Sequence, residues 1–324
     1  MARDLRYFLP NTLVEVTNVT FQNRSFLRPS EELNDIFLGV LGLAQKRHAM
    51  PLCGVVVLST HFHLLTIPRD PEHLADFMEY LNTNLSKEIG RLHGWKGHLW
   101  HDRYHHVPVS NEETMQIHRL RYLLAAGVKE FLVDRVAQWP GVHSAAALTK
   151  GEALAGHWYS RSKEYGDRQR GKKNVDPRKH ASAQRVSLSP LPCWKHLPEK
   201  IWRRHVEELV AEIDAEGAKK RRRTGRCSLG VERIMGRKPT RRPRKVKKSP
   251  RPRYHATAAR EFQRWREALG MVIKEFYDAS GLWRSGDRSV TFPEGTFPPA
   301  PPFVPFAETL LARNSSLQAR GQPG

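Results

Sequence analysis

Hydrophobic and polar positions recur with two different periods in the first 150 residues, and these periods predict an order of strands and helices. Residues 13–20 alternate loosely and are rich in β-branched side chains, which favours a strand. The apolar run 52–58 and the segment 62–67 predict two neighbouring strands. Apolar residues recur at helical spacing after Ser30 and again after Asp70-Pro71, so each of these positions is expected to begin an amphipathic helix.

Two further elements complete this part of the pattern. Residues 99–109 are expected to return as a strand. Ser110 followed by Glu113 is a capping box, so a helix should begin there and run to about Ala126, with Gly127 as a left-handed stop. The resulting order β-α-β-β-α-β-α predicts an α+β fold, with an antiparallel sheet and helices packed on it.

Beyond residue 150 the apolar pattern weakens, and we divide the chain into three parts. Residues 1–150 form the predicted α+β domain, residues 151–190 a basic linker, and residues 191–324 a basic, partly helical region with a proline-rich tail. Proline residues between 239 and 252 are expected to keep the most basic stretch extended.

The net charge is concentrated in this second half. The chain has 54 Lys+Arg residues against 33 Asp+Glu, a net charge of +21, and residues 151–324 hold 38 of the basic residues. Such a segment attracts a polyanion by counterion release, so nucleic acid is the expected partner, and a solvated linker is the alternative. The side chains expected to contact phosphate are Lys219, Lys220, Arg221, Arg222, Arg223, Arg241, Arg242, Arg244, Lys245, Lys247 and Lys248.

Composition also excludes some classes of protein. No run of about 18 apolar residues exists, so we expect no membrane contact. The first residues lack the apolar stretch of a signal peptide. The three cysteines are widely spaced without a C-x-x-C motif, which is typical of a reducing cytoplasm and argues against a cysteine zinc site.

His61 and His63 are the residues that most clearly point to chemistry. Positions i and i+2 of a strand face the same way, so both imidazoles should project together while Phe62 points to the other side. Two adjacent imidazoles are half of a site for a divalent cation. Alone, however, an H-x-H pair is a weak motif.

Several motifs in order strengthen this interpretation. The run VVVLSTHFHLLTIP, a long helix, GHLWHDRYHHVPV and RYLLAAGVKEFLVDRVAQWPGVHSAA together resemble the REP-associated tyrosine transposases of the HUH superfamily, over roughly residues 10–147. The resemblance implies an HUH, ferredoxin-like domain in which His61 and His63 bind Mg²⁺ or Mn²⁺. It also implies that Tyr122 attacks single-stranded or hairpin DNA and forms a 5′-phosphotyrosine. A monomer or a homodimer is expected.

One position departs from this family. Relatives carry Asn or Gln one turn after the tyrosine, where it can complete the metal shell, and here that residue is Ala126. His118 lies one turn before Tyr122 on the same helical face, as a third ligand or as a base for the tyrosine. The alternative is a catalytically weakened, transposase-derived protein that binds DNA or RNA without cutting it.

The segment 100–106 offers competing candidates. Tyr104 is a second candidate nucleophile. Trp100 and Arg103 are expected to line a DNA groove, by stacking and by pairing with the backbone, although Trp100 could equally be a core residue. A zinc site is the third interpretation, although its candidate ligands His101, His105 and His106 lack the helical or loop spacing of a familiar zinc site.

Overall fold

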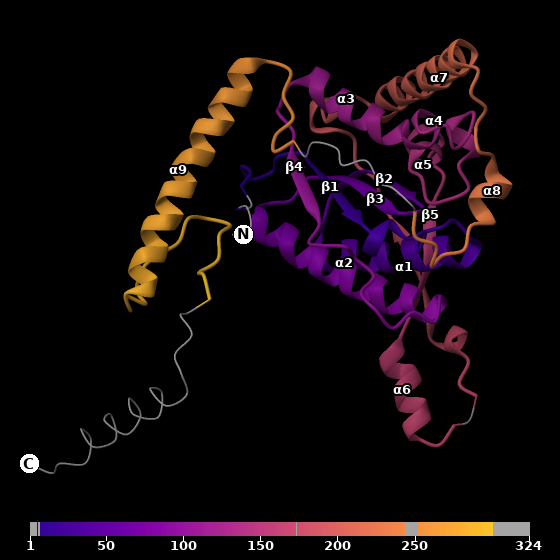
Figure 1. The fold of residues 1–324 in the computed structure, drawn as a ribbon, viewed down its shortest axis with the longest axis horizontal. Coiled ribbons are helices and arrows are strands. Elements are labelled where there is room, and N and C mark those ends of the chain that lie inside the picture. The colour runs from indigo at the N-terminus through magenta and orange to yellow at the C-terminus, as the bar shows by residue number, and fades with distance from the viewer. Residues whose placement is uncertain (1–4, 6, 173, 244–251, 301–324) are drawn as a thin grey trace, which may run out of the picture. The chain divides into compact units, whose positions relative to one another are not determined.

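The fold is built on a four-stranded antiparallel sheet (Figure 1). The computed structural model describes residues 5, 7–172, 174–243 and 252–300. The strands β1 (Val14–Val19), β2 (Leu52–Leu58), β3 (His61–Thr66) and β4 (His105–Pro108) lie in the order β2-β3-β1-β4. The predicted α+β class is therefore confirmed, although the fourth strand is shorter than the expected range 99–109.

Helices cover both faces of this sheet. The helices α1 (Glu31–His48) and α2 (Pro71–Leu92) bury one face in a core that contains Phe37, Phe62 and Phe77. The other face is covered by α3 (Glu113–Leu124), α4 (Ala126–Lys129), α5 (Ala145–Lys150) and α7 (Glu199–Thr224), whose core includes Leu120, Trp139 and Trp202. Because both faces are buried, each central strand presents alternate residues to two different environments.

Local sequence explains where α1 and α2 begin. The Ser30 hydroxyl accepts a hydrogen bond from the Leu33 amide at 3.1 Å, and the Asp70 carboxylate accepts one from the His73 amide at 2.7 Å. Both caps confirm the expected helix starts. The capping box at Ser110 and Glu113 was wrong, because the Ser110 hydroxyl donates to Glu112 instead.

The end of α3 also differs from expectation. Gly127 lies inside α4 and is not left-handed, and the residue that is left-handed beyond it is Phe131, with φ of 55°. The polypeptide therefore continues in helical conformation past the predicted stop.

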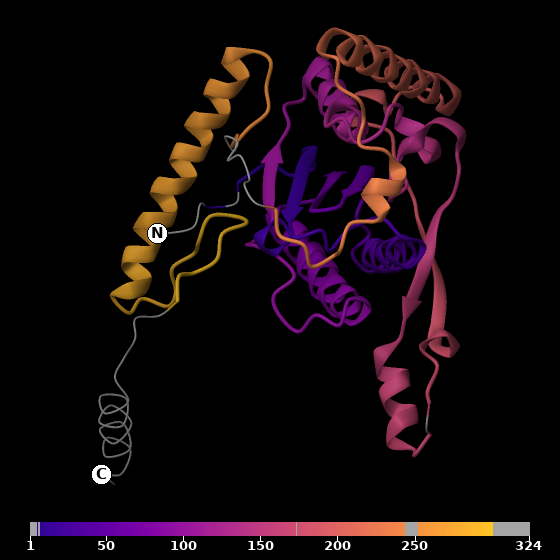
Figure 2. The same cartoon turned by 45° about the vertical axis from the view of Figure 1, so that its right-hand side comes forward.

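Residues 151–190 were expected to form a linker, but they form regular secondary structure instead. They form the antiparallel ribbon β5 (Leu154–Tyr159) and β6 (Ala181–Val186), with α6 (Arg161–Gln169) and the 3-10 turn η3 (Pro177–His180) between the strands. Figure 2 shows this ribbon extending past the sheet to α6. The ribbon packs against α1, where Gly39 and Gly156 let the two backbones approach closely. Sequence pattern missed these strands because their apolar contacts are few.

Three 3-10 turns, η1 (Phe21–Asn23), η2 (Val136–Gln138) and η4 (Pro192–Trp194), and the short helix α8 (Val231–Met235) complete the unit formed by Phe8–Trp265. Among the described residues, a second unit consists of Leu5, Tyr7 and residues 266–300. It contains most of α9 (Ala259–Arg284), and its Phe276 and Trp283 rings pack against Phe292. Every helix in the described part of the chain is too short or too polar to span a membrane.

The close approach of α1 and β5 predicts a specific destabilisation. A Cβ atom on Gly39 would lie 2.0 Å from the His157 carbonyl oxygen, so Gly39→Ala forces the ribbon away from α1. We expect a loss of about 1–3 kcal/mol in the free energy of unfolding, measured in urea. Gly270→Ala is the matched control, since it also lies within a helix but meets no atom within 4 Å. An equal effect of the two changes would contradict this account.

Candidate active site

The pairing of β3 places His61 and His63 on one face of the sheet. His63 lies opposite Thr17 of β1, and His61 lies opposite Val19. The two imidazole centroids are 5.0 Å apart. Phe62 points to the opposite face, where its ring contacts Phe37 at 5.4 Å. The expected same-face arrangement is therefore present.

Both imidazoles are held through their Nδ1 atoms. His61 Nδ1 lies 2.9 Å from the Thr60 hydroxyl, and His63 Nδ1 lies 2.8 Å from the Thr17 hydroxyl. Within the described residues, neither Nε2 atom has a hydrogen-bond partner. Burial, together with the charges of His63 and Lys129, lowers the pKa of His61 to about 3, so this imidazole is neutral at neutral pH. Neutral imidazole is the form that binds metals.

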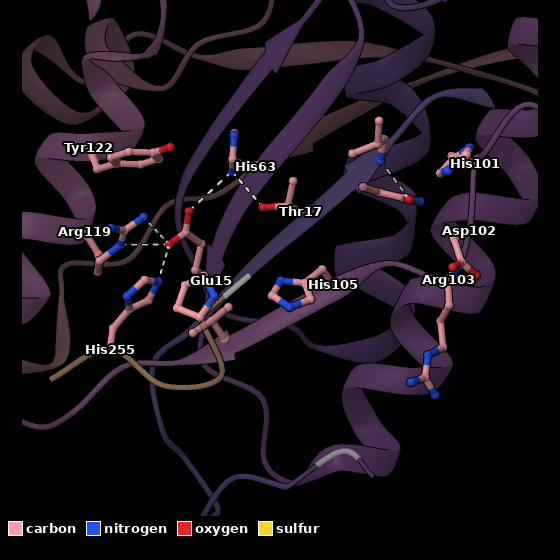
Figure 3. Close-up of a pocket in the computed structure, with 14 residues that line it drawn as sticks. Glu15, Thr17, His63, His101, Asp102, Arg103, His105, Arg119, Tyr122 and His255 are labelled. Carbon is pink, nitrogen blue, oxygen red and sulfur yellow. Dashed lines mark hydrogen bonds and ion pairs between the residues drawn. The ribbon is translucent and has the colours of Figure 1, made fainter. Parts of the chain in front are cut away.

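Tyr122 comes to this pair from the last turn of α3. Its ring centroid lies 6.1 Å from that of His63, and in Figure 3 its hydroxyl end points to the side where His63 lies. The Lys129 ammonium is 3.5 Å from the centre of the Tyr122 ring, and the Arg119 guanidinium carbon is 4.2 Å from it. Two cations therefore flank the ring. Arg119 is paired with Glu15, whereas Lys129 is in a position suited to an anionic substrate.

Tyr122 lies between two cavities. The first, about 250 Å³, is lined by His63, Arg103, Arg119 and His255 among others. The second, about 490 Å³, lies between α3, α4 and α7. Its wall includes Glu216, which pairs with Arg121 at 2.6 Å, and the cationic side chains Arg121, Lys129, Lys219, Lys220 and Arg223. A polyanion at the tyrosine would meet net positive charge in the second cavity, whereas Glu15 and Asp102 offset Arg103 and Arg119 in the first.

Glu15 is the site residue that the sequence did not reveal. It lies on β1, is 5% exposed, and accepts hydrogen bonds from Arg119 Nε at 2.8 Å (Figure 3). Burial alone would raise the pKa of Glu15, but hydrogen bonds from His255 and His63 and the charge of Arg119 outweigh it and hold the pKa far below its usual range. No motif marks this glutamate, because its partners come from distant parts of the chain.

His255 was missed for the same reason. Residues 252–258, here called the strap, run beside the end of β4, where the His255 amide donates to the Pro108 oxygen and the Ser110 amide donates to the His255 oxygen. The Glu112 carboxylate accepts from the Thr257 and Ala258 amides at 2.8 and 2.9 Å. Glu112, the N-cap residue of α3, therefore holds the strap beside the start of this helix through two hydrogen bonds.

The other predicted residues occupy varied places. Trp100 packs on Phe62 on the face away from Tyr122, and its Nε1 donates to the Asn82 oxygen at 3.1 Å. Arg103 lines the first cavity as expected of a groove residue. Tyr104 is buried in the core on the α1 and α2 face, so it is not positioned with the histidine pair. Ala126 is buried and packs in the opposite core.

Histidines of the competing zinc interpretation do not converge. His101 and His105 line the first cavity, while His106 contacts Phe8 and Tyr104 on the other face. His118 lines the second cavity beside Tyr122. Among the described residues, no group of three or more His, Cys, Asp or Glu side chains is arranged to hold a metal ion.

The two basic runs differ in how they can be described. Lys219–Arg223 lies in the last turns of α7, with Lys219, Lys220 and Arg223 on the second cavity and Arg221 paired with Asp134 at 3.0 Å. Arg222 is exposed there, and Arg241 and Arg242 are exposed after α8. Outside the described residues lie Arg244, Lys245, Lys247 and Lys248.

The donor atoms present fit a divalent metal as a two-nitrogen site. His61 and His63 offer Nε2 atoms from one face, without a hydrogen-bond partner among the described residues. Imidazole suits first-row metals such as Zn²⁺ and Fe²⁺, whereas Mg²⁺ and Mn²⁺ prefer oxygen. The remaining positions would need water or substrate oxygens.

Comparison with known proteins gives a limited likeness. No family model and no curated protein matches the chain. Among solved structures, a REP-associated tyrosine transposase bound to a REP hairpin is similar, with a TM-score of 0.38 and 17% identity over 47% of this chain and 87% of that chain. A putative transposase from Deinococcus radiodurans has a TM-score of 0.27 and 20% identity over 37% of this chain and 95% of that chain. The function is therefore argued from the site.

The half-buried His61 predicts a pH-dependent stability. Its pKa is about 3 in the folded chain and about 6.5 when unfolded, so between these values only the unfolded state takes up the proton. Stability should therefore fall as the pH drops below about 6.5, by about 2 kcal/mol from this residue at pH 5. Urea unfolding of the chelated protein at pH 7.5 and 5.0 measures the difference. His61→Gln should reduce it by about that amount, and an unchanged difference would contradict this explanation.

Proposed function

We propose that this protein cleaves and rejoins single-stranded DNA, with Tyr122 as the nucleophile beside a divalent metal on His61 and His63. The observation that carries the proposal is the placement of Tyr122, whose ring lies 6.1 Å from His63 and on the same side of the sheet as the histidine pair. A phenol hydroxyl, two metal-competent nitrogens and surrounding cations are the parts that phosphoryl transfer to a tyrosine needs.

The proposed reaction is a transesterification. The Tyr122 oxygen attacks the scissile phosphorus, the Oη–P bond forms and the P–O3′ bond breaks, which leaves a 5′-phosphotyrosine and a free 3′-hydroxyl. The phenol proton passes to a base, for which His118 and water are the candidates, and the leaving oxygen is protonated. A metal bound by His61 and His63 supplies Lewis-acid polarisation of the phosphate. The phosphodiester energy is kept in the new bond, so rejoining needs no nucleotide cofactor.

The second cavity supports a role in binding the DNA strand. Lys219, Lys220 and Arg223 of α7 line the same cavity as Tyr122. Phosphate contacts of this kind carry no sequence information, so they raise affinity for every strand and align it at the tyrosine. Hairpin DNA is the form of single-stranded substrate to test first.

A second function deserves comparison, since one observation favours it. Ala126 is buried among apolar side chains where a third ligand would be expected, and no third ligand joins His61 and His63 among the described residues. A protein that binds single-stranded DNA without cutting it fits this feature. The two functions are distinguished by a covalent protein–DNA adduct, which only the nuclease forms.

Tyr122→Phe should abolish the adduct and leave DNA binding within about twofold, because it removes only the hydroxyl and keeps the ring beside His63. Radiolabelled hairpins incubated with Mn²⁺ and separated on a denaturing gel provide the measurement. Tyr104→Phe is the matched control and should keep full adduct formation, since Tyr104 lies in the opposite core. An adduct that survives Tyr122→Phe and disappears with Tyr104→Phe would identify the other tyrosine as the nucleophile. Absence of any adduct in the unaltered protein would favour the binding function.

Replacing Lys219, Lys220 and Arg223 with alanine should weaken DNA binding and reduce its dependence on salt. Each contacted phosphate of a single strand contributes about −0.7 to the log–log slope of affinity against salt, so three lost contacts should flatten the slope by about 2. Site preference should stay the same. The control removes equal charge from the other end of α7 and the turn before it, at the exposed residues Lys195, Lys200 and Arg204. Equal slopes in both triple variants would show that only net charge matters.

A further inference from the structure

The proposed reaction assigns no role to the Glu15 carboxylate. Glu15 is a buried carboxylate on β1, next to the histidine pair, and neither nucleophilic attack nor strand binding uses it. Moving a carboxylate out of water costs free energy, and the attraction of a buried ion pair does not always offset that cost. The pairing of Glu15 with Arg119 is therefore weak evidence that Glu15 stabilises the fold. An apolar residue of similar size at this position would build the same sheet. Because the sheet does not need a carboxylate at this position, we look for the role of Glu15 in the site.

The geometry around His63 indicates that role. Glu15 Oε1 lies 3.3 Å from His63 Nδ1, which also lies 2.8 Å from the Thr17 hydroxyl. If Nδ1 carried a lone pair, it would face the carboxylate, and the two would repel each other. With the proton on Nδ1, His63 donates to both oxygens. The lone pair is then on Nε2, which has no partner among the described residues.

We infer that Glu15 is a positioning residue that holds His63 in the Nδ1–H tautomer and so directs the Nε2 lone pair into the site as a metal ligand. The inference rests on the proposed function for its metal, but the tautomer is a property of the metal-free chain. A carboxylate that accepts from the non-ligating nitrogen also fixes the orientation of the ring and makes the ligating nitrogen more basic.

Glu15 is in turn held from two directions. Arg119 of α3 approaches Oε2 through Nε at 2.8 Å and Nη2 at 2.5 Å. His255 of the strap reaches the same oxygen through Nε2 at 3.2 Å. One carboxylate thus connects the histidine strand, the helix that carries Tyr122 and a segment 240 positions away in sequence. Its orientation toward His63 is set by these two donors, since a carboxylate with its lone pairs engaged cannot rotate away.

The direct test is nitrogen NMR of the metal-free protein labelled with ¹⁵N-histidine. The His63 signals, assigned by their loss in His63→Gln, should show the proton on Nδ1 in the unaltered chain. Glu15→Gln alone would leave the buried Arg119 cation uncompensated, so the informative variant is the double change Glu15→Gln with Arg119→Gln. We expect its His63 to populate the Nε2–H tautomer. Arg119→Gln alone should keep Nδ1–H, because Glu15 remains and His255 still holds its Oε2.

A second measurement reports on the ligand itself. Mn²⁺ affinity, followed by the decrease of the free-ion EPR signal, should fall about 10–100-fold in the double variant. Asp35→Asn is the matched control, since it removes a carboxylate 2.7 Å from His157 on the ribbon and should leave Mn²⁺ affinity unchanged. Should the double variant not fold, Glu15→Asp keeps the charge for Arg119 and withdraws it from His63, and it should shift the tautomer in the same direction.

Two outcomes would overturn the inference. One is a folded Glu15 variant whose His63 keeps the Nδ1–H tautomer and whose Mn²⁺ affinity stays within twofold. The other is a shift of the tautomer by Thr17→Val and not by the Glu15 variants, which would make Thr17 the positioning residue. Failure of the proposed function looks different. In that case His63 shows the expected tautomer in the unaltered chain and its shift in the variants, while no protein–DNA adduct forms.

Discussion

The two-residue alternation of β3 is the constraint on which this structure depends. A strand buried on both faces must commit each side chain to one of two environments, and here the even position Phe62 enters the core under α1 and α2 while His61 and His63 enter the site. A shift of one residue in the pairing with β1 would exchange the two sets, with an imidazole in the apolar core and a phenyl ring in the site. The strand register that buries Phe62 in the core is therefore also the register that places His61 and His63 in the site.

The parts of the fold and site that could be predicted from sequence are those that depend on residues close together in the chain. The same-face histidines follow from strand geometry, and the caps at Ser30 and Asp70 follow from local hydrogen bonding. Tyr122 was placed by a resemblance in motif order and not by any local physical signal, and its catalytic role stays a prediction.

The parts that could not be predicted depend on contacts between distant residues. Glu15 is one glutamate in an apolar strand, and nothing near it in sequence shows that Arg119 and His255 will meet it. The capping box failed because the Ser110 hydroxyl donates to Glu112, whose carboxylate also accepts from the distant backbone amides at 257 and 258. The expected linker at 151–190 is a ribbon whose fit depends on the missing side chain at Gly39, which local periodicity does not reveal.

The strap has a consequence for the order in which the site is made. In a chain synthesised from its N-terminus, the residues of β1, β3 and α3 have all been added once residue 124 is in place. Glu15 acquires its last donor only after His255 has followed, more than a hundred residues later. Closing so long a loop is slow compared with forming local contacts. The tyrosine and the histidines are therefore synthesised well before the last residue that holds the carboxylate behind them.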